Sequence, residues 1–400
     1  MSEDLDFQAL DALVGQFFNI TNRVISSQNQ PFSITYRGIL KSKDSEKSFE
    51  NLSAGLTPFG LIPRFYYDKG NQVIQLIHLP PKTKPTNARI NLILFIATLL
   101  SVLFTGGLIS IKENLPTDWF QAISIIISKG WPFALSLLAI LAAHEFGHFF
   151  AGKRNGVQVT LPYFIPMPLS AFGTMGAFIN MRSLPKNKKA LFDLSITGPL
   201  CGFLVSIMVL LIGLNLSTVE FLPENLGSGI SLQMEGNSLL YLGLKYVVFG
   251  KLLPNPSNLS GIPLIVFWLQ YFFTGHPFPW NSLDVILHPV AWAGWAGLFV
   301  TTINLLPVGQ LDGGHIFSTA FGIDKTRQIF PIIIAGLILL GFFWTTWWIW
   351  AALLLLMGRF YAEPLDQITP LDNKRKRLAW LAVAIFLLTF IPVPLMIVQM

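Results

Sequence analysis

The chain has 400 residues, of which 52% are hydrophobic and only 12% are charged, about half the charged share of an ordinary soluble domain. This composition excludes a water-soluble globule and a disordered tail, and the single cysteine, Cys201, excludes a disulfide scaffold or a thiolate metal cluster. The net charge of +6 comes from short basic segments between apolar runs, which is typical of loops that flank membrane spans. The sequence therefore predicts a polytopic membrane protein that contacts membrane lipids and no nucleic acid.

Residues 1–85 are expected to form a small, soluble N-terminal α/β domain. A helix is predicted where apolar residues recur at helical spacing, at Phe7, Leu10, Val14 and Phe17. Two apolar runs, 61–67 and 73–79, flank a short polar turn and predict a hairpin. Residues 80–85, rich in Pro and Lys, predict a stiff basic linker. The acidic start has neither the apolar run of a secretory signal nor the Arg-rich pattern of a transit peptide, which favours a bacterial chain.

Residues 86–400 are expected to form an all-α membrane domain. Its spans are predicted from the apolar runs, at residues 90–111, 131–151, 191–214, 285–306, 329–357 and 378–398. As a single helix, the run 329–357 would be about 43 Å long, too long for a hydrocarbon core of about 30 Å, so we expect a hairpin turning near residues 344–348. We expect about seven to eight transmembrane helices: seven if residues 239–273 stay outside the membrane, or nine if they cross twice.

The charges of the loops predict how the chain is oriented. The segment between the second and third spans carries six basic residues and no acidic one, and Lys374-Arg375-Lys376-Arg377 is a second basic run. By the positive-inside rule both are cytoplasmic, which also places the N-terminus in the cytoplasm. Residues 215–237 carry Glu220, Glu224 and Glu235 and no Lys or Arg, so we expect them on the far side.

The second span ends in the pattern His144-Glu145-Phe146-Gly147-His148. Two His residues four apart lie on one face of a helix and can reach a single Zn²⁺, while Glu145 stands where it can take a proton from a metal-bound water. Polar residues that join helices in the bilayer are the alternative. Ionisable groups are costly at membrane depth, which favours a functional site.

A catalytic zinc needs a third protein ligand and an open fourth position. The candidates near membrane depth are Asp193, Asp284, His288, Asp312, His315 and Glu363. Asp312 has the richest context, because it follows a predicted span that returns toward the cytoplasmic face, where the His pair also lies. Pro307 and the neighbouring glycines break the helix there, and a broken backbone is tolerated in membranes only where it lines a polar cavity.

With His144-Glu145-x-x-His148 in one span and Asn304-x-x-Pro307 and Leu311-Asp312-Gly313 in another, the chain resembles the site-2 protease family of intramembrane zinc metalloproteases. Further stretches resemble its cyanobacterial and plastid branch, namely Phe172-Gly-Thr-Met-Gly-Ala-Phe178, Gly198-Pro199-x-x-Gly202 and His288-Pro289.

The resemblance implies Zn²⁺ held by His144, His148 and Asp312, with Glu145 as general base and acid. It implies a transmembrane protein substrate cut within or near the membrane, with contacts from Asn304, Pro307 and Gly313. It also implies a multi-pass protein of the inner or thylakoid membrane of a cyanobacterium-like bacterium.

Several alternatives stay open at the level of sequence. β-like runs at 157–161 and 177–179 predict a short hairpin beside the active site, which either pairs with an unwound substrate or packs on the core. Glu363 would be the ligand in a prenyl-protein-type zincin, and His315 either supports the metal or is a capping or solvated residue. A metal-binding transporter or an inactive protease is a further class. The sequence determines neither the substrate nor the oligomeric state.

Overall fold

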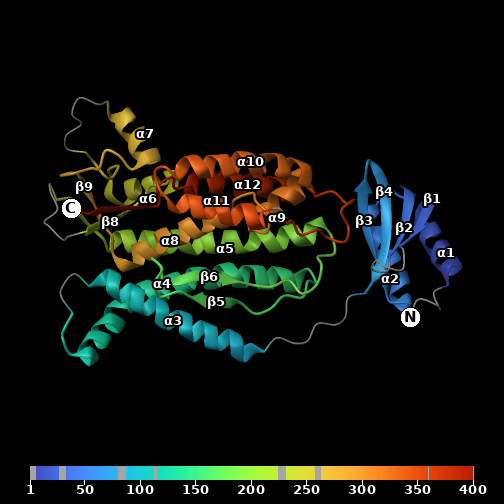
Figure 1. Ribbon diagram of the computed structural model, residues 1–400, viewed down its shortest axis with the longest axis horizontal. Coiled ribbons are helices and arrows are strands. Elements are labelled where there is room, and N and C mark those ends of the chain that lie inside the picture. Colours follow the sequence, from blue (N-terminus) through green and yellow to red (C-terminus); the bar gives the residue numbers. More distant parts are fainter. Residues whose placement is uncertain are drawn as a thin grey trace.

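A computed structural model of the chain describes residues 6–26, 33–79, 87–111, 115–223, 231–256, 263–358 and 360–399. The molecule is elongated, with a bundle of helices lying along its long axis and a small sheet unit at one end (Figure 1). The predicted basic linker, residues 80–85, lies outside the described residues.

The N-terminal unit is a four-stranded antiparallel sheet with strand order β1-β2-β4-β3, accompanied by two helices. Its elements are α1 (Phe7–Phe17), β1 (Phe18–Ile25), β2 (Ser33–Leu40), α2 (Ser45–Leu56), β3 (Leu61–Asp68) and β4 (Asn71–His78). The predicted helix and hairpin are confirmed. The hairpin turns through Lys69 and Gly70, both with positive φ, as a two-residue turn of the primed type requires.

Among the described residues, three helices are long and apolar enough to cross a membrane, α3 (Ala88–Ser110), α4 (Trp119–Arg154) and α5 (Lys188–Asn215). The first and third agree with the predicted spans to within three residues. The second starts at Trp119, a dozen residues before the predicted start, because the helix continues through Pro132. The sequence predicts seven to eight spanning helices. Among the described residues, three helices meet the length and composition expected of a membrane span.

The remaining helices are shorter: α6 (Leu239–Phe249), α7 (Leu264–Thr274), α8 (Pro289–Asn304), α9 (Asp312–Phe321), α10 (Ile323–Leu340), α11 (Thr346–Met357) and α12 (Asn373–Thr389). α6 and α7 have 11 residues each, about 16 Å, which is too short for a hydrocarbon core of about 30 Å. The apolar run 329–357 is broken into α10 and α11 as predicted, although the break at 341–345 falls slightly earlier than expected.

For two predicted spans, the helix in the structure is shorter than the apolar run that predicted it. The run 285–306 begins in strand β9 (Leu283–Ile286), and α8 starts only at Pro289, where His288 caps the helix and proline suits its first turn. The run 378–398 stops being helical at Thr389, since Pro392 and Pro394 cannot continue a helix, and it ends in strand β10 (Leu395–Gln399).

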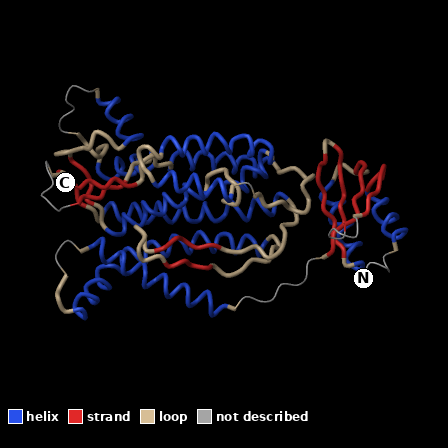
Figure 2. Tube along the Cα trace, in the orientation of Figure 1, coloured by secondary structure: helices blue, strands red, loops and turns tan. Residues whose placement is uncertain are grey.

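Three two-stranded sheets accompany the bundle, and Figure 2 shows them in red beside the blue helices. β5 (Tyr163–Pro166) pairs with β6 (Thr174–Phe178) in the hairpin expected between the second and third spans. The predicted strand at 157–161 is wrong, because only an isolated bridge from Val159 to Met181 forms there and β5 starts two residues later. The other pairs, β7 (Thr218–Phe221) with β9 and β8 (Ser231–Glu235) with β10, lie at the end of the bundle opposite the N-terminal unit (Figure 1).

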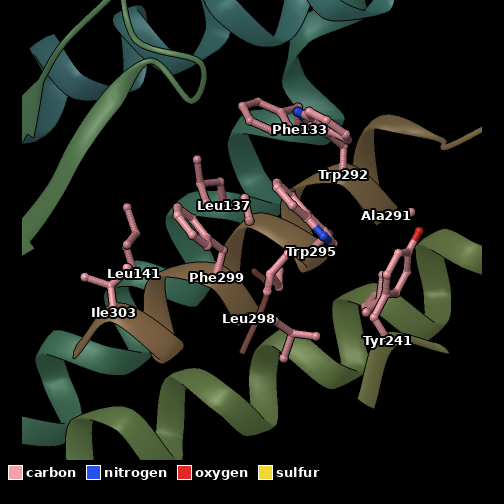
Figure 3. Packing of buried hydrophobic residues seen from close by; sticks show 14 of the residues in the cluster. Phe133, Leu137, Leu141, Tyr241, Ala291, Trp292, Trp295, Leu298, Phe299 and Ile303 are labelled. Carbon is pink, nitrogen blue, oxygen red and sulfur yellow. The ribbon is translucent and has the colours of Figure 1, made fainter. Parts of the chain in front are cut away.

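α8 is the buried centre of the bundle. Trp295 and Leu298 are fully buried, and Figure 3 shows Trp295 and Phe299 packed toward Phe133 and Leu137 of α4. Small residues let α8 approach α5 closely, since a Cβ on Gly294 would lie 2.6 Å from the backbone of Leu210. This packing holds the end of α8 beside α4 and α5.

Candidate metal centre

The metal centre starts on α4, which is held between α5 and α8. His144 and His148 stand one turn apart on the same face, with their Nε2 atoms 3.0 Å apart. His144, Glu145 and His148 are each at most 5% exposed. The i, i+4 spacing thus places two imidazoles side by side inside the protein.

Asp312 reaches the same point from α9, of which it is the first residue. Its Oδ2 lies 3.2 Å from Nε2 of His144 and 3.3 Å from Nε2 of His148. A tetrahedral zinc with ligands at about 2.0–2.1 Å has ligand-to-ligand distances of about 3.3 Å. The three donors therefore have nearly the spacing of three corners of a zinc tetrahedron, and two imidazoles with one carboxylate suit zinc.

A broken segment between α8 and α9 brings Asp312 to this place. Gly309 has a φ of +52°, which disfavours other residues. A Cβ on Gly313 would lie 2.1 Å from the carbonyl oxygen of Leu305, so only glycine lets α9 start this close to the end of α8. Pro307 and Gly313, predicted to contact substrate, line an apolar groove instead of the metal cavity.

Backbone and side-chain groups orient the two imidazoles. Nδ1 of His148 lies 2.7 Å from the carbonyl oxygen of Leu194, which fixes that nitrogen as the donor and leaves Nε2 for a metal. Asn304, at the end of α8, points its amide nitrogen to within 3.3 Å of Nε2 of His144. Asn304 thus lies at the metal centre, and its contact with substrate stays a prediction.

Glycines on α5 make room for the imidazoles. A Cβ on Gly198 would lie 2.1 Å from Nε2 of His148, and one on Gly202 would lie 3.1 Å from Nδ1 of His144. Gly198 and Gly202, which the sequence offered as part of the family resemblance, thus let α5 pack closely beside the His-bearing helix α4. The sequence did not show that these glycines touch the imidazoles themselves.

A cavity of about 220 Å³ opens at the metal centre. The end of the hairpin forms one wall of the cavity, through Ala177 and Phe178. The backbone N–H of Ile179, the next residue, donates a hydrogen bond to the carboxylate of Glu145. Within the described part of the chain, Oε2 of Glu145 and Nδ1 of His315 are buried without a hydrogen-bond partner. His315 is 6% exposed, which excludes the solvated alternative. The cavity thus offers two polar groups for a water molecule or a reacting group.

The other candidate ligands are engaged elsewhere. Asp193 forms a two-pronged ion pair with Arg375, at 2.7 and 2.6 Å, and Asp284 lies 3.8 Å from the buried Lys245. His288 caps α8. Glu363 pairs with Arg64 of the N-terminal unit. Within the part of the chain that the structure describes, Asp312 is the carboxylate that joins the two His residues.

Comparison with known proteins places this centre among zinc peptidases. The sequence matches the profile described as peptidase family M50 over residues 132–344, just over half of the chain. It is 30% identical over 270 residues to the protein of Arabidopsis thaliana named probable zinc metalloprotease EGY1, chloroplastic, a match that covers 67% of this chain and 44% of that protein. It is 26% identical over 400 residues to the probable zinc metalloprotease EGY2, chloroplastic, of the same plant, covering 97% of this chain and 65% of EGY2. The chain thus spans about half to two thirds of the length of these two relatives.

Proposed function

Because the chain belongs to peptidase family M50, we propose that it is a zinc endopeptidase that hydrolyses peptide bonds of membrane-anchored proteins, within or near their transmembrane helices. The observation that supports this most strongly is the His144–His148–Asp312 cluster, whose three donor atoms are spaced for one zinc ion with Glu145 beside them. The family and its plastid relatives supply the reaction class.

Each residue has a distinct role in this proposal. A zinc ion held by the two imidazoles and Asp312 would acidify a bound water and polarise the scissile carbonyl. Glu145, whose carboxylate lies beside the three donors, would act as the general base that takes a proton from the attacking water and as the acid that returns it to the leaving amine. Asn304 donates a hydrogen bond to the substrate or the tetrahedral intermediate, since its amide lies at the same centre.

The membrane arrangement is part of the proposal. α3, α4 and α5 each cross the membrane, the broken pair α8–α9 crosses once, α10 and α11 form a hairpin of short arms, and α12 crosses last. That is seven crossings, with α6 and α7 outside the bilayer. The basic segments then face the cytoplasm, as does the N-terminal domain of residues 1–85, while residues 86–400 form the peptidase domain.

The hairpin β5–β6 is proposed to receive the substrate. A helix hides its own carbonyls, so a transmembrane substrate must unwind before hydrolysis. β5 lies against α3, where the Asn91 amide donates to the carbonyls of Leu161 and Pro162. The end of β6 lines the metal cavity through Ala177 and Phe178. An extended substrate added beside β6 would pass the metal centre.

Substitution of Glu145 by Gln tests the proposal. Glu145→Gln keeps the size of the side chain and removes the base, so the variant should retain zinc yet lose cleavage by a factor of at least ~10². Membrane proteomes of cells with the wild-type enzyme and with the variant should differ in full-length substrates that accumulate. A variant that keeps its cellular activity would contradict catalysis by Glu145 and favour a metal transporter or a non-catalytic role.

A further inference from the structure

An apolar groove runs along the outer side of the bundle between α9, α10 and α12. Its volume is about 540 Å³, and every side chain that lines it is apolar. α10 contributes Ile329 and Ile333, α12 contributes Val383 and Phe386, and α9 contributes Phe317. The groove is separate from the metal cavity, and the proposed reaction does not use it.

The floor of this groove is the back of the segment that carries the metal ligand Asp312. Leu305, Pro307 and Gly313 line the groove, and they stand between or directly beside Asn304 and Asp312 in the chain. Other residues of the same segment, Asn304 and Asp312 among them, line the metal cavity. Whatever fills the groove therefore packs against the backbone that positions Asp312.

α10 and α12 run in the same direction along the groove. The indole nitrogen of Trp347, at the start of α11, donates to the carbonyl oxygen of Pro392 at 2.6 Å. α11 begins directly after α10 ends, and Pro392 directly follows α12, so the last turns of α10 and α12 lie at the same end. Their first turns therefore lie together at the other end, beside α9 (Figure 1).

That end of the groove carries two lysines. Lys325 precedes the lining residue Ile329 by one helical turn, and Lys376 precedes Val383 by two turns, so each lies on the groove face of its helix. Both side chains are exposed, and neither has a hydrogen bond or ion pair among the described residues. Helical spacing turns Lys374 and Arg377 to the opposite face of α12.

The chemistry of the groove favours a lipid. The side chains that line it offer no polar group, which suits an acyl chain, and an anionic headgroup is what two lysines at the membrane surface attract. A wholly apolar lining would leave the polar backbone of an unwound peptide without partners.

We propose that this groove binds one acyl chain of an anionic phospholipid, with Lys325 and Lys376 holding its phosphate. The lipid then packs against the segment that carries Asp312. This proposal concerns lipid binding alone and does not require the chain to be a peptidase.

Photo-crosslinking of the full-length protein in lipid nanodiscs tests the site. The probe is phosphatidylglycerol with a diazirine in one acyl chain, and the reference is phosphatidylcholine with the same chain. We expect phosphatidylglycerol to label peptides of residues 329–340 and 382–390 at least three times more than phosphatidylcholine. The double variant Lys325→Gln/Lys376→Gln should abolish this preference. Lys374→Gln/Arg377→Gln makes the same charge change on the other face of α12 and should preserve it.

A second variant tests the groove itself. No atom lies within 4 Å of a Cβ placed on the lining residue Gly336, so Gly336→Phe fills the groove without forcing the backbone to move. It should reduce labelling of these peptides by both lipids, while zinc content shows that the fold is retained. Equal labelling by the two lipids, an unchanged preference in Lys325→Gln/Lys376→Gln, or unchanged labelling in Gly336→Phe would each overturn the proposal and leave only ordinary lipid contact.

Discussion

The geometry of the metal centre depends on a neighbouring residue that has no side chain. Nδ1 of His148 is held by the carbonyl of Leu194, so the ring cannot swing away from a new atom on its other side. That other side is occupied by Gly198, which offers no side chain. The imidazole of His148 is thus held by a backbone carbonyl on one side, and on the other side it fits only because Gly198 has no Cβ.

Gly198→Ala should therefore weaken zinc binding. Its Cβ would lie 2.1 Å from Nε2 of His148, in contact with the ligand atom itself. We expect zinc affinity to fall about 10- to 100-fold, the range seen when groups that orient ligands are lost. Gly243→Ala on α6 is the matched control, because its Cβ meets no atom within 4 Å. Zinc competition titrations that give equal affinities for the two variants would contradict this reading of Gly198.

Glu235, at the end of the bundle opposite the N-terminal unit, predicts a pH dependence. Burial raises the pKa of its carboxyl to about 7, although the nearby Lys245 acts in the other direction. A raised pKa means that the folded state prefers the neutral acid, whose stabilising effect is complete below the ordinary pKa of about 4.5 and disappears as the pH rises through 7. The buried groups around it are Tyr241, which donates a hydrogen bond of 2.8 Å, Asp284 and Tyr271.

Thermal unfolding of the wild type and of Glu235→Gln between pH 5 and 8 measures this effect. The wild type should lose stability relative to the variant as the pH rises, on the order of 2 kcal/mol over the range. The difference between the two proteins cancels the titration of other groups. Parallel curves for the two proteins at all pH values would show that Glu235 stays charged in the fold.

The helices and strands were predicted correctly where a single sequence feature, such as the length of an apolar run or a turn motif, determines the element. The length of the apolar runs predicted α3 and α5, and the turn at Lys69 and Gly70 predicted the β3–β4 hairpin. Apolar composition failed at residues 285–288 and 395–398, because a short apolar strand and the end of a membrane helix have the same composition and only proline separates them here. The spacing of His144 and His148 predicted a shared helix face, and the family resemblance, together with the helix break, pointed to Asp312. The structure brings the three donor atoms within 4.8 Å of one another. The roles of Gly198, Leu194 and Ile179 could not, since they depend on tertiary contacts between segments far apart in the chain.

The β6 strand carries a prediction at this scale. Met175 has no partner in the register with β5, so a proline there removes one N–H from the strand and leaves the hairpin paired. Met175→Pro should retain zinc and reduce cleavage of a transmembrane substrate at least ~10-fold. Met175→Ala keeps the backbone N–H and should cleave like the wild type. Equal cleavage by both variants would favour a hairpin that only packs on the core.

At the scale of the whole molecule, the N-terminal sheet unit is docked on two loops of the helical body. Phe65 of β3 exchanges backbone hydrogen bonds of 2.8 Å with Leu365 and Gln367. Ion pairs surround this contact, namely Lys186–Glu50, Lys189–Glu46 and Arg64–Glu363. The first loop leads directly into α5, whose glycines contact the two imidazoles of the metal centre.

Reversal of two of these charges should loosen the contact. Exposed ion pairs contribute up to about 1 kcal/mol each, so Glu46→Lys/Glu50→Lys should raise amide hydrogen exchange of Phe65 and Gln367, whose N–H groups cross the contact, several-fold. Asp68→Lys removes an ion pair with Arg37 inside the N-terminal unit and serves as the control. If exchange at these two amides rises equally in the control, the interface ion pairs do not hold the unit in place.

The zinc content of Asp312→Asn tests the central claim most directly. The claim is that one cation is held by two imidazoles of α4 and the carboxylate of Asp312. Purified wild-type protein and Glu363→Gln should each carry about one zinc per chain, while Asp312→Asn should carry little or none, because a neutral amide is a poor ligand for zinc. Full zinc occupancy in Asp312→Asn, or its loss in Glu363→Gln alone, would contradict the account.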